Sequence, residues 1–212
     1  LAVNALTNVW YPPEEKLALG FYVDFSHGQP VLYPSHITDA YLNIPAKFIE
    51  AMVLSRLASG NRDDLNVDRE VLEAQLGFLG DDGLTYCPTD TLNQFAENRP
   101  FSEVWGEGRL LLALAMLAQI DNDPRWTEIG KRKVDRLLEL TREKNGFRFL
   151  WKGRFSPGET VPSDADEPAE PRANGSLADD DPTFSRIYSV GALGHGAGLF
   201  YRVTGYSPAL EL

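Results

Sequence analysis

One stretch of sequence decides the fold: Glu103-Val104-Trp105-Gly106-Glu107-Gly108-Arg109, followed by an apolar run over residues 110–118. Every position of that run is leucine, alanine or methionine, so a helix formed there is apolar on all its faces and must be buried all round. Helices covered on both sides are the inner helices of an all-helical assembly. Polar residues at the start of such a helix face a central cavity, and this segment is therefore the first candidate for an active-site wall.

The composition indicates a soluble globular protein, either cytoplasmic or exported. The chain has 212 residues, of which 43% are hydrophobic and 24% charged, enough for one sizeable core. Its net charge of −11 argues against nucleic acid and an anionic membrane surface as partners, and no apolar run is long enough to cross a bilayer. A homo-oligomer is compatible with the composition. The start at Leu1, without methionine or leader, predicts a fragment of a longer toroid.

Apolar periodicity predicts helices along most of the chain. One stripe at helical spacing runs from residue 37 to the Gly60-Asn61 pair, with Pro45 marking a kink or a restart. Further helices are predicted over residues 67–79, 102–120 and 124–144. The last of these has one apolar face, and its other face, which includes Lys133, is predicted to meet solvent. Residues 19–25 and 147–152 are predicted strands.

A final helix is predicted over residues 183–204, where four glycines alternate with large apolar residues. Each glycine costs about 0.8–1 kcal/mol relative to alanine in a helix, so a neighbouring helix or a ligand must approach the backbone closely there. Before this helix, residues 156–182 are rich in proline, acidic residues and small residues, and we predict a flexible acidic insertion loop.

The pieces repeat along the chain. Turns after residues 60, 121 and 205 each end a long buried helix, and a second helix is predicted to follow each of them. The predicted unit is inner helix, turn, outer helix and a short strand or hairpin. The fold class is therefore mainly α, one domain over residues 1–212 made of antiparallel helical hairpins, with about three hairpins present.

This unit, with Trp105-Gly106-Glu107-Gly108-Arg109 at the start of an inner helix, resembles the six-hairpin glycosidase superfamily, whose fold is an (α/α)6 toroid. The opening segment is similar to the inner-helix start of unsaturated uronyl hydrolases. Gly194-His195-Gly196 is similar to the Gly-His segment of bacterial β-L-arabinofuranosidase-like proteins. The resemblance implies a carbohydrate-active enzyme, most simply a glycoside hydrolase, acting on an oligosaccharide or polysaccharide of plant or algal origin.

Glycoside cleavage requires two carboxylic groups that face one sugar, which makes the acidic residues at inner-helix starts the catalytic candidates. Glu107 and Asp39 are predicted as acid or base, although an acid in the first turn of a helix also favours the positive end of the helix dipole. His195, flanked by glycines, is the third catalytic candidate, against the alternative of a core histidine.

Substrate binding is assigned to aromatic and polar residues near the same helix starts. Trp105 is a predicted stacking platform for a sugar, and Arg109 is predicted to hold a substrate carboxylate, unless it pairs with a neighbouring acid. The other predicted substrate-binding residues are His36, Asn43, Tyr86 and Tyr188. No cofactor is predicted, and the lone Cys87 has no neighbouring cysteine or histidine at metal-ligand spacing.

Three alternatives to the glycoside hydrolase stay open. One is a polysaccharide lyase on the same scaffold. Another is a zinc enzyme, because Gly194-His195-Gly196 and Gly198 are also similar to the His-Gly-x-x-Gly element of lanthionine cyclases. The third is a toroid that binds carbohydrate without cleaving it.

Overall fold

The computed structural model describes residues 2–10, 20–26, 28–35, 41–88, 100–121, 123–162 and 187–212. Its helices are α1 (Ala2–Thr7), α2 (Ile44–Ser59), α3 (Leu65–Leu76), α4 (Val104–Asp121), α5 (Pro124–Glu139), α6 (Ile187–Thr204) and the 3-10 helix η3 (Ser207–Glu211). The strands are β1 (Gly20–Asp24), β2 (Val31–Ser35), β3 (Ser102–Glu103), β4 (Thr141–Lys144), β5 (Phe147–Leu150) and β6 (Arg154–Phe155). The protein is mainly helical, as the sequence predicts.

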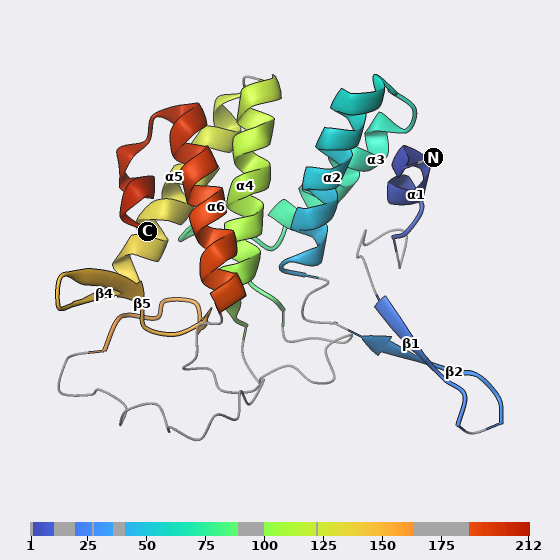
Figure 1. Cartoon of the computed structure of the whole chain (residues 1–212), viewed down its shortest axis with the longest axis horizontal. Coiled ribbons are helices and arrows are strands. Elements are labelled where there is room, and N and C mark those ends of the chain that lie inside the picture. Colours follow the sequence, from blue (N-terminus) through green and yellow to red (C-terminus); the bar gives the residue numbers. More distant parts are fainter. Residues whose placement is uncertain are drawn as a thin grey trace.

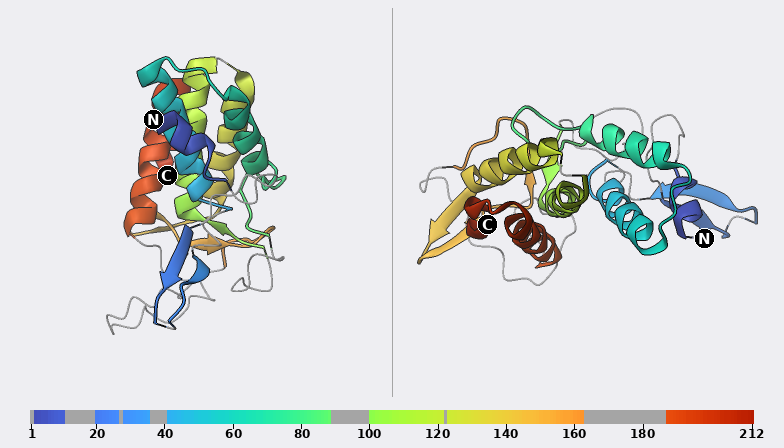
Figure 2. Two further views of the ribbon diagram at one scale, coloured as in Figure 1. Left: turned by 90° about the vertical axis from the view of Figure 1, so that its right-hand side faces the viewer. Right: turned by 90° about the horizontal axis from the view of Figure 1, so that it is seen from above.

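The long helices form two layers (Figures 1 and 2). α2, α4 and α6 stand side by side in one layer and begin at the same end of the molecule, whereas α3 and α5 run back in the second layer. The described chain therefore contains successive helical hairpins, α2 with α3 and α4 with α5, and η3 follows α6. None of the helices in the described part of the chain is long and apolar enough to cross a membrane.

Helix α4 lies at the centre of the core, as its apolar sequence predicts. The side chains at residues 110–115 are buried almost completely, and they contact the helices on both sides. With α2, α3 and the first turns of α5 it encloses a cluster that includes Ile49, Leu72, Leu114 and Trp126. With α5 and α6 it encloses a second cluster around Leu111 and Phe200.

Helices α4 and α6 touch backbone to backbone. A Cβ atom placed on Gly196 would come within 2.2 Å of the carbonyl oxygen of Gly108, and one on Gly108 would come within 2.4 Å of the Leu193 amide nitrogen. This confirms that a neighbouring helix approaches the glycine-rich helix closely. The other glycines of α6 do not share this contact, since no atom lies within 4 Å of a Cβ built at Gly191, Gly194 or Gly198.

Helices α2 and α5 have boundaries that differ clearly from the prediction. Helix α2 begins at Ile44, and Pro45 occupies the first turn, where its missing N–H is not needed, so the proline marks a start and not a kink. Helix α5 ends at Glu139 and not at Lys144, because residues 141–144 form β4 and pair with β5. Asn145 and Gly146 join these two strands with positive φ angles of 55° and 78°, as a type I′ hairpin turn requires.

Among the predicted strands, residues 19–25 correspond to β1 and residues 147–152 to the shorter β5. Helix α1 and strand β2, which pairs with β1 in an antiparallel hairpin, were not predicted. Of the predicted acidic insertion, residues 156–162 are described, and Lys152 forms an ion pair with Glu159 there. The remainder of that insertion, residues 163–182, lies outside the described residues.

Candidate functional site

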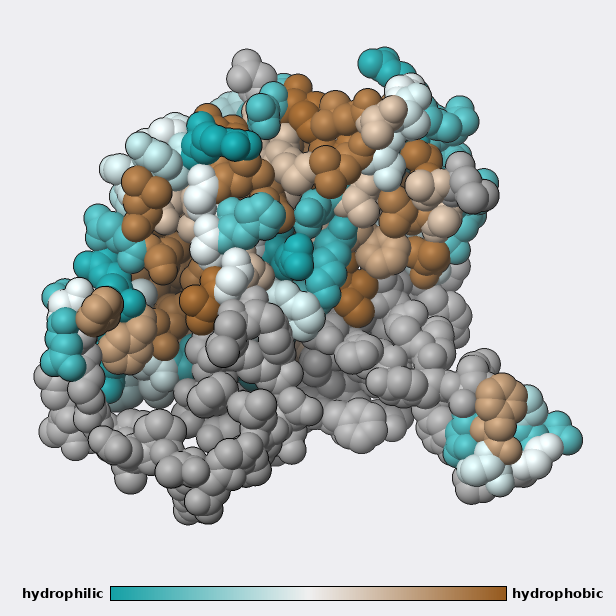
Figure 3. Space-filling model, in the orientation of Figure 1, coloured by the Kyte–Doolittle hydropathy of each residue, from teal (hydrophilic) through white to brown (hydrophobic). Residues whose placement is uncertain are grey.

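The first candidate site is a cluster on the layer formed by α2, α4 and α6, which we call the inner-face cluster: Lys47 and Glu50 of α2 with Trp105 and Arg109 of α4. Trp105 and Arg109 are one helical turn apart, and both are partly exposed. The Lys47 ammonium lies 4.0 Å from the centre of the Trp105 ring, and an Arg109 guanidinium nitrogen lies 3.4 Å from a Glu50 carboxylate oxygen. Figure 3 shows hydrophilic side chains in the middle of this face.

This cluster combines an aromatic ring with two cations, the group of side chains that can hold an acidic sugar. The Arg109 side chain is 32% exposed, so one edge of its guanidinium group meets solvent. Its Nε is buried and has no hydrogen-bond acceptor among the described residues. The buried Nε is out of reach of a ligand, but the partly exposed guanidinium group can donate to an oxygen of a ligand while it keeps the contact with Glu50.

Glu107 lies on the opposite side of α4 and is 1% exposed. One of its carboxylate oxygens accepts hydrogen bonds of 2.7 Å from the Thr85 amide and from the Ser102 hydroxyl. The other oxygen is in contact with the ammonium of Lys133, which is 0% exposed and also donates to the Gly83 carbonyl at 2.9 Å.

Both carboxylate oxygens of Glu107 are thus occupied by the protein itself, and no substrate can reach them from solvent. This geometry favours a structural role for Glu107 over the catalytic role suggested by the sequence. It also corrects the placement of Lys133, which was predicted on the solvent face of α5. Lys133 is buried because its ammonium compensates the charge of Glu107 across the two helices.

The remaining predicted residues do not form one group. His195 is exposed on α6, beside Gly194 and Gly196, and no hydrogen bond or ion pair joins it to another described residue. Asn43 precedes α2 and is completely buried. His36 and Asp39 lie outside the described residues, as does the side chain of Tyr188, whose backbone is in the first turn of α6.

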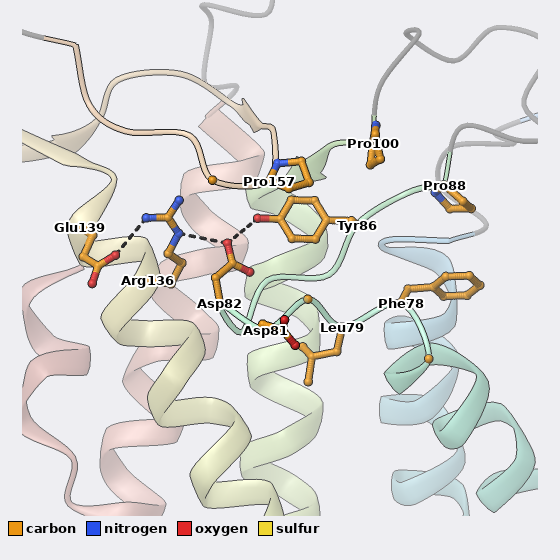
Figure 4. Close-up of a pocket in the computed structure, with 13 residues that line it drawn as sticks. Phe78, Leu79, Asp81, Asp82, Tyr86, Pro88, Pro100, Arg136, Glu139 and Pro157 are labelled. Atoms are coloured by element: carbon orange, nitrogen blue, oxygen red, sulfur yellow. Dashed lines mark hydrogen bonds and ion pairs between the residues drawn. The ribbon is translucent and has the colours of Figure 1, made fainter.

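The second candidate site is a pocket of about 640 Å³ at the end of the molecule where α4 begins, which we call the end pocket (Figure 4). Its apolar wall contains Phe78, Leu79, Pro88, Pro100 and Pro157. Its size is in the range of small-molecule sites.

A three-residue network forms the polar wall of the end pocket. The Tyr86 hydroxyl donates to Asp82 at 2.6 Å, and the Arg136 Nε donates to the same Asp82 oxygen at 3.1 Å. Burial, followed by the hydrogen bond to Asp82, raises the pKa of Tyr86 far above its usual value. Tyr86 therefore keeps its proton and acts as a hydrogen-bond donor. Tyr86 thus lies in the wall of the end pocket, and its role in substrate binding stays a prediction.

Asp81 also lines the end pocket and is exposed. Unlike Asp82, it has no hydrogen bond or ion pair with another described residue. Two neighbouring carboxyl groups in one pocket therefore differ in environment: Asp82 is fixed by a cation and a hydroxyl, and Asp81 is free to bind a ligand or exchange a proton.

Sequence reasoning missed Lys47, Glu50, Asp82 and Arg136 as members of a site. The spacing of Lys47 and Glu50 on one face of α2 is a usable signal only once the neighbouring helix is known. Asp82 and Arg136 are separated by 54 residues. Among the described residues, no group of three or more histidine, cysteine or acidic side chains is placed to hold a metal ion.

Comparison of the chain with known proteins gives no further assignment: no protein family, curated protein or solved structure matches it.

Proposed function

We propose that the protein is a carbohydrate-active enzyme, most simply a glycoside hydrolase, built on a toroid of helical hairpins. The substrate is an oligosaccharide or a polysaccharide chain. It binds at the end of the molecule where α2, α4 and α6 begin, between the inner-face cluster and the end pocket.

The observation that carries this proposal is the placement of Trp105 beside two cations near the start of an inner helix. The partly exposed indole ring offers a flat apolar surface, which suits the C–H face of a sugar ring. Lys47 and Arg109 lie next to it and provide donors for hydroxyl or carboxylate oxygens. The resemblance to six-hairpin glycosidases supports the same location, because inner-helix starts form the site there.

Hydrolysis needs one carboxylic acid that protonates the glycosidic oxygen and one carboxylate that either takes a proton from the attacking water or attacks the sugar carbon itself. We assign these two catalytic roles to Asp39, which precedes α2 in the sequence, and to Asp81 of the end pocket. Glu107 is left out, since Lys133, Thr85 and Ser102 occupy its oxygens.

The test is the release of reducing ends from a panel of neutral and uronate-containing oligosaccharides. We expect Asp39→Asn or Asp81→Asn to reduce turnover by at least a hundredfold, in line with the usual effect of removing an acid or base. Trp105→Ala is expected to raise KM more than it lowers kcat. Asp135→Asn, on the solvent side of α5, is the control and is expected to retain full activity.

The same panel separates the alternatives. Products with a new carbon–carbon double bond, seen by ultraviolet absorbance, identify a lyase and refute hydrolysis. Stoichiometric zinc in the purified protein, with loss of activity on chelation, identifies the zinc enzyme. Binding of a sugar in calorimetry without any product identifies a carbohydrate-binding protein, and neither binding nor product refutes the proposal entirely.

A further inference from the structure

A second cavity lies at the opposite end of the helices, where α2 and α4 finish and α3 and α5 begin. We call it the hairpin groove, because it separates the α2/α3 hairpin from the α4/α5 hairpin. Its volume is about 770 Å³, within the range of small-molecule sites. It does not share any residue with the end pocket or with the inner-face cluster.

The floor of the hairpin groove is apolar. Met52, Leu117 and Trp126 line it, and all three are buried in the central core cluster. The rim also carries exposed apolar side chains: Leu57 is 62% exposed, and Leu65 and Ile120 are each 44% exposed. Figure 3 shows hydrophobic side chains gathered at the upper ends of α2 and α4. Covering such a surface with an apolar chain removes it from water and is therefore favourable.

Two of the arginines that line the groove are neutralised by the protein. Arg56 forms two hydrogen bonds with Asp68, at 2.7 and 3.0 Å, and their attraction raises the pKa of Arg56. Arg125 contacts Glu73 at 3.1 Å. These pairs are complete without a ligand.

Arg62 and Arg69 also line the groove, but they have no hydrogen bond or ion pair with another described residue. The remaining carboxylates of the groove have other donors: Asp121 accepts from the Trp126 indole nitrogen, and Asp123 accepts from the Arg125 amide and caps α5. Arg62 and Arg69 are thus the two cations of the groove lining that have no partner among the described residues. Their guanidinium donors remain available to an anionic group of a ligand.

From this juxtaposition we infer that the hairpin groove binds an amphiphilic carboxylate. Its hydrocarbon chain covers Met52, Leu57 and Leu117, and its carboxylate lies between Arg62 and Arg69. A guanidinium group binds a carboxylate through two parallel hydrogen bonds, which explains why arginine and not lysine occupies both positions. This inference does not depend on the proposed enzymatic function.

The test is isothermal titration calorimetry of the full chain with decanoate, below its micelle concentration, with decanol as the uncharged probe. We expect saturable binding of one decanoate per chain and at least tenfold weaker binding of decanol. The variant Arg62→Gln/Arg69→Gln is expected to weaken decanoate binding about tenfold and to leave decanol binding unchanged. Both arginines are exposed, so the variant is expected to fold normally.

Arg148→Gln is the matched control. Arg148 is also exposed, but it lies on β5, where it pairs with Glu211, so its removal is expected to leave decanoate binding intact. The tryptophan emission of the wild-type protein is expected to change on binding, and this change is expected to vanish in Trp126→Phe. The inference is refuted by the absence of saturable decanoate binding, by equal affinity for decanol, or by unchanged affinity in the double arginine variant.

Discussion

At the scale of single residues, the ion pair between Glu107 and Lys133 is the most consequential feature of the structure. Both side chains are excluded from water, and each is almost fully satisfied by the other and by Gly83, Thr85 and Ser102. Removing two charges from water is costly, so such a pair is stable only while it is complete.

We therefore expect Lys133→Met to lower the free energy of unfolding by about 3–5 kcal/mol, because it leaves the Glu107 carboxylate buried without a cation. Adding Glu107→Gln is expected to restore part of that loss, since the amide oxygen still accepts from Thr85 and Ser102. Urea unfolding measures both effects.

The control for this experiment is Lys131→Met. Lys131 pairs with Glu128 on the surface of the same helix, so we expect a change within about 0.5 kcal/mol. Equal effects of Lys133→Met and Lys131→Met would mean that the buried pair contributes nothing to stability.

At the scale of elements, the contact between α4 and α6 separates two kinds of glycine on one helix. Gly196 faces the Gly108 carbonyl oxygen, and Gly194 faces open space. The sequence predicts a close approach somewhere along this helix. It does not predict which glycine makes that approach, because the partner helix lies about 85 positions away along the chain.

We expect Gly196→Ala to destabilise the protein by about 1–3 kcal/mol or more, because the methyl group forces two backbones apart. Gly194→Ala is the matched control and is expected to stabilise the helix by up to about 1 kcal/mol, since alanine restricts the unfolded chain more than glycine. The unfolding temperatures of both variants test this prediction. A higher unfolding temperature for Gly196→Ala than for the wild-type protein would contradict the observed packing.

The elements themselves were largely predictable. Helices α2 to α6 follow from apolar periodicity, and α4 follows from its uniformly apolar sequence. Strand β4 was missed because Thr141–Lys144 is polar and continues the charged pattern of α5, so only its pairing with β5 reveals it. The prediction that Lys133 faces solvent was wrong for a similar reason: its partner Glu107 lies 26 residues away on another helix.

The candidate sites were less predictable than the fold. Trp105 and Arg109 were candidates from the sequence alone, because aromatic and charged residues stand out at the start of an apolar helix, and their role in binding stays a prediction. Their neighbours Lys47 and Glu50 were not, since α2 has to pack against α4 before these four side chains meet. The end pocket likewise depends on loops and helix ends from several parts of the chain.

At the scale of the whole molecule, two tyrosines link stability to alkaline pH. A hydrogen bond to Asp135 and burial raise the pKa of Tyr206 from 10.0 to about 12, and the pKa of Tyr86 is also raised. A folded-state pKa above the unfolded one means that the folded protein holds its protons longer as the pH rises.

We therefore expect the full contribution of both tyrosines to stability below pH 10, and a progressive loss as the pH rises from 10 through 12. In Tyr206→Phe the free energy of unfolding is expected to fall less steeply with pH in that range. Urea unfolding at several pH values between 9 and about 12 measures it. The same slope in the wild-type protein and in Tyr206→Phe would rule out Tyr206 as a source of the pH dependence.

The glycine contact between α4 and α6 also has a mechanical consequence. At the contact between Gly108 and Gly196 the two backbones touch directly, and side chains such as Leu111 and Phe200 extend the packing between α4 and α6. Because a direct backbone contact has no rotamers to change, we expect α4 and α6 to move together. The α2/α3 hairpin meets α4 through side chains and flanks the hairpin groove. We therefore expect bending to be concentrated between α2 and α4, so that a ligand wedged into one end of that junction would change the separation of Lys47 and Trp105 at the other.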